Sequence, residues 1–154
     1  MTSLRVIDII DGTSVDGPGL RTSIYFAGCD HRCPGCHNPS TWDFNAGCDM
    51  TVDELIDRIV DNDSNVTFSG GDPLYQLEAL TELARRIKSV GKTIWCYTGF
   101  IYEDLLADEK YTELLSLIDV LVDGPYIQAL RDPDLPFRGS SNQRLIELNA
   151  SHNS

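Results

Sequence analysis

Apolar and polar residues follow two periods along the chain, one typical of β-strands and the other of helices. Short runs rich in β-branched and aromatic residues predict six strands. They span residues 4–10, 22–27, 65–68, 93–97, 119–122 and 145–148. Apolar residues also recur three and four positions apart, which predicts a helix from Thr51, a helix over 74–90, and a helical pair over 102–107 and 111–117.

One predicted helix carries a start signal in its sequence, and another carries a stop signal. Thr51 and Glu54 have the spacing of a capping box, in which each side chain bonds the backbone amide of the other residue. Gly91 follows the longest helix and is a typical C-terminal stop. The residues expected to face the core are Leu55, Ile56, Ile59 and Val60 in the first helix and Leu77, Leu80, Leu83, Ala84 and Ile87 in the second.

Strands that alternate with helices predict βαβ units and a mostly parallel sheet. A closed eight-stranded barrel takes about 200 residues or more, and this chain has 154. We therefore expect an α/β fold that forms an open partial (β/α) barrel of about five or six mostly parallel strands. A single domain is expected over residues 1–154, with a tail that is frayed from about residue 149.

Four motifs come directly after predicted strands. They are the cysteine-rich loop GCDHRCPGCHN (28–38), the segment SGGDP (69–73), Thr98-Gly99 and Asp123-Gly124. Because the carboxyl ends of parallel strands share one edge of a sheet, we expect these motifs to line one rim. That rim is the predicted site.

Charge and cysteine content narrow the possible functions. Acidic side chains outnumber basic ones by 24 to 12, and a surface this negative disfavours binding to nucleic acid or to membranes. No apolar run approaches the roughly 20 residues that span a bilayer, and the N-terminus lacks the features of a signal peptide, so we expect a cytoplasmic protein. Thiols stay reduced in that compartment, so five cysteines indicate metal or redox chemistry rather than disulfides.

The cysteine-rich loop places Cys29, Cys33 and Cys36 close together in the sequence. Three thiolates at these spacings suit either zinc or an iron–sulfur cluster. Zinc takes four ligands, and the candidates for the fourth are Cys48, His31 and His37. In a four-iron cluster held by three cysteines, one iron is free to bind a small molecule. The spacing alone leaves both metals open.

Longer motifs carry a resemblance to a known family. The spacing C-x3-C-x2-C is similar to the signature of the radical S-adenosylmethionine enzymes, and DGPGLRTSIYFAGCDHRCPGCHNPSTWD (16–43) resembles the N-terminal signature of the glycyl-radical-enzyme activating enzymes. SGGDP, WCYTG (95–99), VLVDG (120–124) and RGSSNQ (138–143) resemble the branch of that family that acts on the anaerobic ribonucleoside-triphosphate reductase. The resemblance extends over about residues 7–148.

The resemblance implies a [4Fe–4S] cluster and bound S-adenosylmethionine. Cys29, Cys33 and Cys36 would ligate three irons, and the amino and carboxylate groups of S-adenosylmethionine would bind the fourth. In the family the SGGDP segment holds that amino group, which implies this role for Gly70, Gly71 and Asp72. The other cofactor contacts expected are Gly35, Cys36, His37 and Thr98.

Two of these contacts stay open at this point. Many relatives carry an aromatic residue near the adenine at the position of Gly35, so here either His37 or the backbone around Gly35 takes that contact. Thr98 either touches the ribose or methionine part of the cofactor or only turns the chain.

The implied reaction is reductive cleavage of S-adenosylmethionine followed by hydrogen abstraction from a glycine Cα. The implied partners are the large glycyl-radical subunit of the anaerobic ribonucleoside-triphosphate reductase and a low-potential electron donor of the flavodoxin type. No catalytic residue beyond the cluster and the cofactor is expected, since the chain shows no convincing acid–base pair.

Three alternatives compete with this interpretation. The first is a sibling enzyme, which either activates a glycyl radical enzyme of the pyruvate formate-lyase type or acts on a small molecule. The second is a non-catalytic zinc module that uses Cys48 as the fourth ligand. The third is a small electron-transfer iron–sulfur protein, which would bind no S-adenosylmethionine.

Overall fold

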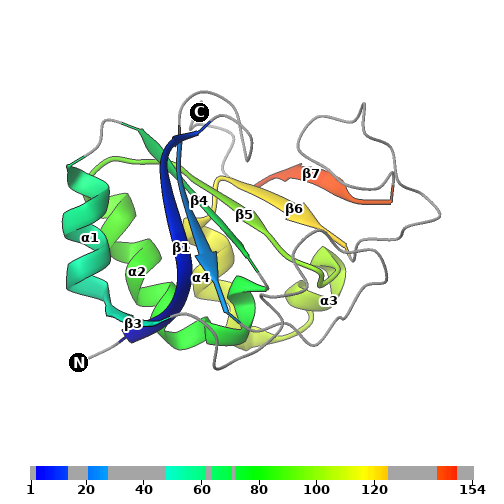
Figure 1. Cartoon of the computed structure of the whole chain (residues 1–154). Coiled ribbons are helices and arrows are strands. Elements are labelled where there is room, and N and C mark those ends of the chain that lie inside the picture. Colours follow the sequence, from blue (N-terminus) through cyan, green and yellow to red (C-terminus); the bar gives the residue numbers. More distant parts are fainter. Residues whose placement is uncertain are drawn as a thin grey trace.

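The computed structural model of the chain describes residues 3–13, 21–27, 48–61, 64–70, 72–124 and 142–148 (Figure 1). Its strands are β1 (Ser3–Thr13), β2 (Arg21–Phe26), β3 (Cys48–Thr51), β4 (Asn65–Gly70), β5 (Ile94–Tyr97), β6 (Val120–Asp123) and β7 (Arg144–Glu147). Its α-helices are α1 (Val52–Val60), α2 (Leu77–Ser89), α3 (Tyr102–Leu106) and α4 (Thr112–Leu117). Two short 3₁₀ helices, η2 (Pro73–Gln76) and η3 (Glu109–Tyr111), precede α2 and α4.

The strands form one seven-stranded sheet in the order β3-β1-β2-β4-β5-β6-β7. β2, β4, β5 and β6 are parallel to one another in the middle of the sheet. β1, β3 and β7 add antiparallel pairings on the two sides. The prediction of an α/β fold with a parallel sheet is therefore confirmed for the central strands, whereas the partial barrel stays a prediction.

All six predicted strands are present, and β3 is the additional one. This strand has the sequence CDMT, and its residues are exposed or only partly buried. It pairs with the first half of β1, from Ser3 opposite Thr51 to Val6 opposite Cys48. Only Met50 of β3 packs against the main core, and one apolar contact in a strand of four residues leaves no alternating hydrophobic pattern that would reveal it.

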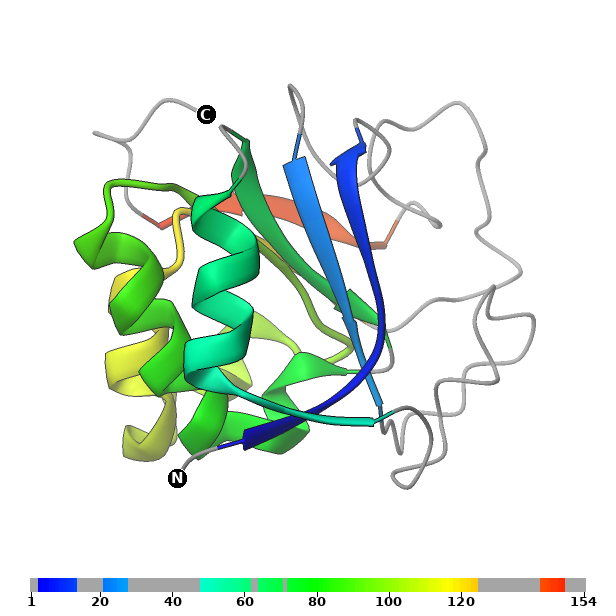
Figure 2. The same cartoon turned by 60° about the vertical axis from the view of Figure 1, so that its left-hand side comes forward.

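Helices α1, α2 and α4 cover one face of the sheet (Figure 2). Their apolar faces pack on side chains that alternate strand residues send to that face, and together they form the main core. The strand residues of this core include Ile24, Phe26, Val66, Phe68, Ile94, Cys96 and Leu121. In the described ranges, no helix is both long and apolar enough to cross a membrane.

Helix α1 begins as the sequence predicts. The amide of Glu54 donates to Thr51 Oγ1 at 3.1 Å, and the amide of Thr51 donates to Glu54 Oε1 at 3.0 Å, so the capping box is confirmed. The inward placement of Val60 is wrong, because its side chain is 48% exposed. Val52 is buried instead, which turns the apolar face of α1 away from its last residue.

The second predicted helix begins one turn later than expected. Residues from Pro73 to Gln76 form η2, and α2 proper starts at Leu77, which is only partly buried. The other four predicted inward residues of α2 are buried. Gly91 has φ of 83° and donates to the carbonyl of Lys88, so it ends the helix in the left-handed conformation that glycine favours.

Candidate functional site

The carboxyl ends of four neighbouring parallel strands meet at one edge of the sheet. These ends are Phe26 in β2, Gly70 in β4, Tyr97 in β5 and Asp123 in β6. Phe26 lies directly opposite Gly70 in the register of β2 and β4. The chain therefore enters the cysteine-rich loop beside the SGGDP segment, and for the described residues the predicted rim is confirmed.

Several predicted site residues lie outside the described residues. These are Cys29, Cys33, Gly35, Cys36, His37 and Gly71, as well as the tail from residue 149. Of the predicted cofactor contacts, the structure describes Gly70, Asp72 and Thr98. Their roles toward a cofactor stay predictions.

Asp72 joins the end of β4 to the end of β5. Its side chain is fully buried, and its Oδ1 accepts from the amide of Leu74 at 3.1 Å. The other oxygen, Oδ2, accepts from the amide of Gly99 at 2.8 Å. The hydroxyl of Thr98 lies 3.0 and 2.9 Å from the two carboxylate oxygens and donates to this carboxylate. Two predicted site residues, Asp72 and Thr98, are thus in direct contact.

Thr98 also makes hydrogen bonds with the residues that follow β5 and with the end of β6. Its Oγ1 accepts from the amide of Phe100 at 3.1 Å, and its own amide donates to the carbonyl of Val122 at 3.0 Å. The amide of Gly124 donates to the carbonyl of Phe100 at 2.9 Å. The segments that follow β4, β5 and β6 therefore form one hydrogen-bonded unit.

Gln76 joins the same unit to β1 and to the end of β2. Its Oε1 accepts from the amide of Arg5 at 2.7 Å, and its Nε2 donates to the carbonyls of Arg5 at 3.0 Å and Ala27 at 3.3 Å. Ala27 is the last described residue before the cysteine-rich loop. The sequence analysis missed Gln76, because a single polar residue inside a predicted helix gives no signal of a long-range contact.

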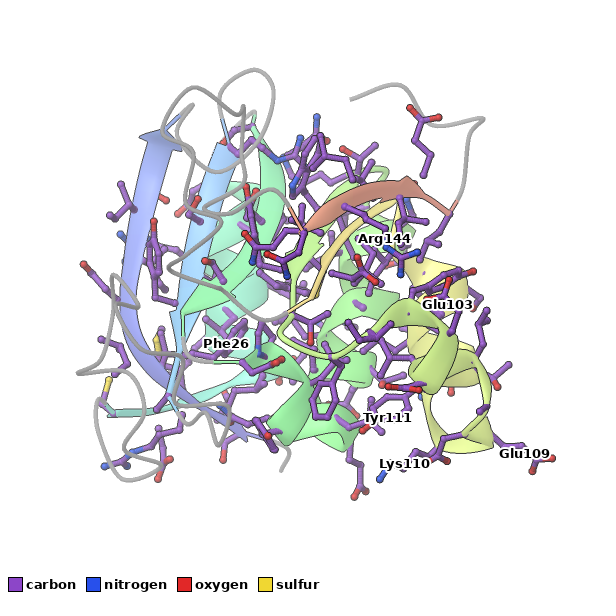
Figure 3. The ribbon with its side chains drawn as sticks, turned by 90° about the vertical axis from the view of Figure 1, so that its right-hand side faces the viewer. Phe26, Glu103, Glu109, Lys110, Tyr111 and Arg144 are labelled. Carbon is purple, nitrogen blue, oxygen red and sulfur yellow. The ribbon has the colours of Figure 1, made fainter. Side chains whose placement is uncertain are left out.

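Asp123 forms part of an ion-pair network at the end of β6. Its buried carboxylate accepts from the amide of Tyr102 at 2.8 Å and from Arg144 Nε at 3.0 Å. Arg144 also forms two hydrogen bonds with Glu103, at 3.1 and 2.7 Å. Figure 3 shows Arg144 on β7 and Glu103 on α3 side by side. The hydrogen bonds from Arg144 lower the pKa of Glu103, and those to Asp123 and Glu103 raise the pKa of Arg144.

This network fixes the position of the turn that follows β6. Asp123 fastens β6 to β7 and to the start of α3. Gly124 then turns the chain with a φ of 99°, a backbone conformation that residues with a side chain rarely adopt. The Asp123-Gly124 pair therefore shapes the edge of the site.

Arg21 anchors the other face of the sheet, at the amino end of β2. Its Nε donates to Thr67 Oγ1 at 2.9 Å and its Nη2 to the carbonyl of Val66 at 2.8 Å. Its guanidinium lies 5.7 Å from the ring centre of Trp95. Burial lowers the pKa of Arg21 to about 10, although Asp119 and Tyr97 act in the opposite direction. Arg21 lies in the predicted signature, but the sequence analysis assigned it no role.

Cys96 is a core residue of β5. Its side chain is fully buried in the core at β5, and burial raises the pKa of its thiol, with the charge of Asp72 adding to the effect. A thiol held protonated is a poor metal ligand. Among the residues that the structure describes, no three His, Cys, Asp or Glu side chains gather as a metal site would need.

The loop cysteines fit an iron–sulfur cluster by their chemistry. They supply three thiolates, the ligands that such clusters take, and the loop leaves β2 at the edge where the ends of β4, β5 and β6 converge. Cys48, the fourth ligand in the zinc alternative, is an exposed residue at the start of β3.

Comparisons with known proteins agree with these features. The family profile described as "4Fe-4S single cluster domain" matches residues 15–146 of this chain. The anaerobic ribonucleoside-triphosphate reductase-activating protein of Escherichia coli (strain K12) is 41% identical over 144 residues, covering 87% of this chain and 92% of the relative. The protein of the same name from Enterobacteria phage T4 is 39% identical over 139 residues, covering 85% and 86%.

A third relative extends the agreement. The activating protein of Vibrio cholerae serotype O1 is 41% identical over 140 residues, covering 84% of this chain and 88% of that protein. The matched residues 15–146 include the three loop cysteines and every strand from β2 to β6. The chain therefore belongs to the family of anaerobic ribonucleoside-triphosphate reductase-activating proteins and carries a 4Fe-4S single cluster domain.

Proposed function

We propose that this chain is a radical S-adenosylmethionine enzyme that activates an anaerobic ribonucleoside-triphosphate reductase. The observation that carries the proposal is the match of a single-cluster [4Fe–4S] profile to a chain whose cysteine-rich loop has only three cysteines at ligand spacing. Three cysteines leave one iron without a protein thiolate, and that iron would bind S-adenosylmethionine. The names of the relatives support the reductase as the target.

The chemistry comes from the bound groups. When bound, the cluster supplies one low-potential electron that splits S-adenosylmethionine into methionine and a 5′-deoxyadenosyl radical. This radical would take the hydrogen atom from one glycine Cα of the large reductase subunit, which would yield 5′-deoxyadenosine and a glycyl radical. A low-potential donor of the flavodoxin type would deliver the electron in the cytoplasm.

The residues of this chain bind and place these groups. Cys29, Cys33 and Cys36 would hold three irons through their thiolates. Gly70 and Gly71 have no side chains, so their backbone can approach the amino group of S-adenosylmethionine closely. The adenine contacts fall to Gly35, Cys36 and His37 in this proposal.

Asp72 and Thr98 enter the proposal mainly through their contact with each other. The Asp72 carboxylate already accepts from at least three donors: the amides of Leu74 and Gly99, and the Thr98 hydroxyl. These bonds favour a role in which the pair fixes the segment that follows β4 against the segment that follows β5. A site held in this way keeps a bound cofactor at one distance from the cluster, which radical transfer requires.

A sibling activity is the second candidate. An activator of a pyruvate formate-lyase type enzyme would use the same cluster and cofactor, so the two candidates differ only in the partner protein. The names of three relatives favour the reductase.

The first experiment tests for radical generation without the partner. The protein is reconstituted anaerobically with iron and sulfide, reduced, and mixed with S-adenosylmethionine, and 5′-deoxyadenosine is measured by chromatography. We expect product from the wild type and from Cys48→Ala, and none from Cys36→Ala. A protein that holds one zinc, loses it in Cys48→Ala and forms no 5′-deoxyadenosine would contradict the proposal.

A further inference from the structure

We propose that Gln76 is a positioning residue, which holds the chain that leads into the cysteine-rich loop at a fixed place relative to the segment after β4. This inference rests on the proposed function, because it concerns the distance between the cluster and the cofactor. It is carried by the contacts of one side-chain amide with two separate strands.

Near the end of β2, the side-chain amide of Gln76 makes the hydrogen bonds to the backbone of Arg5 that a neighbouring strand would otherwise make. Its Oε1 accepts from the amide of Arg5 at 2.7 Å and its Nε2 donates to the carbonyl of Arg5 at 3.0 Å, the pattern that a neighbouring peptide group would make. The second hydrogen on Nε2 serves the carbonyl of Ala27 at 3.3 Å. Ala27 also donates its amide to the carbonyl of Arg5 at 3.0 Å. Both backbone polar groups of Ala27 are thus fixed two residues before Cys29.

Gln76 connects this point to the remainder of the site. It is the last residue of η2, and the first turn of η2 is capped by Asp72 through the amide of Leu74. Asp72 in turn holds Gly99 and Thr98 at the end of β5. A continuous chain of short contacts therefore runs from Ala27, through Gln76 and η2, to the ends of β4 and β5.

The function of this chain of contacts follows from the geometry that the proposed reaction needs. S-adenosylmethionine would touch the cluster through one iron and the backbone near Gly70 through its amino group. An error of about 1 Å between two such points can cost about a hundredfold in rate. A side chain that links Ala27 to η2 sets this distance, whereas a residue with a purely structural role would change only the stability of the fold.

The main test variant is Gln76→Glu. Glutamate keeps the shape and the Oε1 acceptor, but it places a carboxylate oxygen against the carbonyls of Arg5 and Ala27, where Nε2 donates in the wild type. The matched control is Gln143→Glu. The Nε2 of Gln143 donates to the carbonyl of Gly124 at 3.0 Å, so the same chemical change removes one backbone contact at the end of β6. In the sheet, β4 and β5 lie between β6 and β2.

The measurements are made on the reconstituted, reduced protein under anaerobic conditions. They are the dissociation constant of S-adenosylmethionine, the change that it causes in the electron paramagnetic resonance spectrum of the cluster, and the melting temperature. For Gln76→Glu we expect binding weakened by about tenfold or more and a spectrum that differs from the wild type after S-adenosylmethionine is added. For Gln143→Glu, which removes one backbone contact where Gln76→Glu removes two, we expect a smaller change in both than for Gln76→Glu, whatever its melting temperature. Equal binding and equal spectra in Gln76→Glu and the wild type would overturn the inference.

A second measurement separates this inference from the proposed function. Hydrogen exchange at the amide of Arg5 is followed by nuclear magnetic resonance in the full chain without cluster, for the wild type and for Gln76→Leu. We expect exchange about tenfold faster or more in the variant, because the Arg5 amide loses its acceptor. Unchanged exchange would overturn the inference. If exchange accelerates as expected but the wild type forms no cluster, the proposed function fails and the contact itself stands.

Discussion

Replacing Asp72 with asparagine tests whether the carboxylate locks the ends of β4 and β5 together. The two side chains have nearly the same shape, so the change leaves the packing intact and alters only charge and hydrogen bonding. Asp72 accepts from the amides of Leu74 and Gly99 through different oxygens. Asparagine has one oxygen, and its NH2 group must face one of these two amides in either orientation.

The expected cost follows from these contacts. One buried backbone N–H loses a charged acceptor and finds a donor in its place, and leaving such a group unsatisfied costs about 1–3 kcal/mol. The bond that remains also loses the strength that the charge gives it. Because Asp72 is fully buried, the polar atoms of the asparagine that replaces it are shielded from water. We therefore expect Asp72→Asn to lower the free energy of unfolding by about 2–3 kcal/mol.

Urea unfolding at pH 7 measures this free energy, with cluster-free protein under reducing conditions. Asp104→Asn is the matched control, since it makes the same chemical change at an exposed position in α3. The control is expected to lie within about 0.5 kcal/mol of the wild type. If Asp72→Asn is as stable as the control, the carboxylate does not lock the two ends and the account of the rim is wrong.

Three further predictions concern the fold around the site. Because Arg144 lowers the pKa of Glu103, their ion pair stabilises the fold above the ordinary glutamate pKa and is lost as the pH falls through the lowered value. The difference in melting temperature between wild type and Glu103→Gln should therefore shrink below about pH 4 and stay constant from pH 6 to 8; a constant difference down to pH 2 contradicts this. Burial raises the pKa of Cys96. In a variant with serine at the three loop cysteines, a maleimide at pH 8 should therefore label Cys48 in the folded protein and Cys96 only after unfolding. Equal labelling rates for both thiols would refute the buried placement of Cys96. Gly91 has φ of 83° and open space around its Cα, so Gly91→Ala should cost about 1–2 kcal/mol in urea unfolding from backbone strain alone, and no loss of stability would show that the helix end rearranges.

The sequence predicts the central sheet well because burial and sequence pattern coincide there. Val66 and Phe68 in β4 and Ile94 and Cys96 in β5 are all fully buried, so the strands stand out as apolar runs. Local capping signals are equally readable, since the Thr51–Glu54 pair and Gly91 act within a few residues of the chain. These features depend only on neighbours in the sequence.

Features that depend on distant contacts are not readable in the same way. β3 pairs with β1, and its sequence CDMT has no alternating apolar pattern. Gln76 bonds with Arg5, 71 residues away, and Arg21 bonds with Thr67, 46 residues away. A glutamine and an arginine in the sequence have many possible partners, and only the assembled sheet selects one.

In the candidate site, too, the position of the motifs is readable from the sequence, whereas their contacts with distant residues are not. The motifs SGGDP, Thr98-Gly99 and Asp123-Gly124 are predicted to share a rim because each follows a parallel strand, and the described residues do meet there. The division of labour among them is not readable from the motifs. Asp72 binds Thr98, and Asp123 binds Arg144, only because the strand ends are brought side by side.

The most direct test of the central claim is the transfer of hydrogen from glycine to 5′-deoxyadenosine. The large subunit of the anaerobic ribonucleoside-triphosphate reductase is produced with glycine deuterated at Cα, then mixed anaerobically with the reconstituted protein, reductant and S-adenosylmethionine. Mass spectrometry of the 5′-deoxyadenosine and electron paramagnetic resonance of the subunit are recorded together. The account predicts 5′-deoxyadenosine that carries one deuterium and a glycyl radical on the subunit. Unlabelled 5′-deoxyadenosine without a protein radical would contradict it.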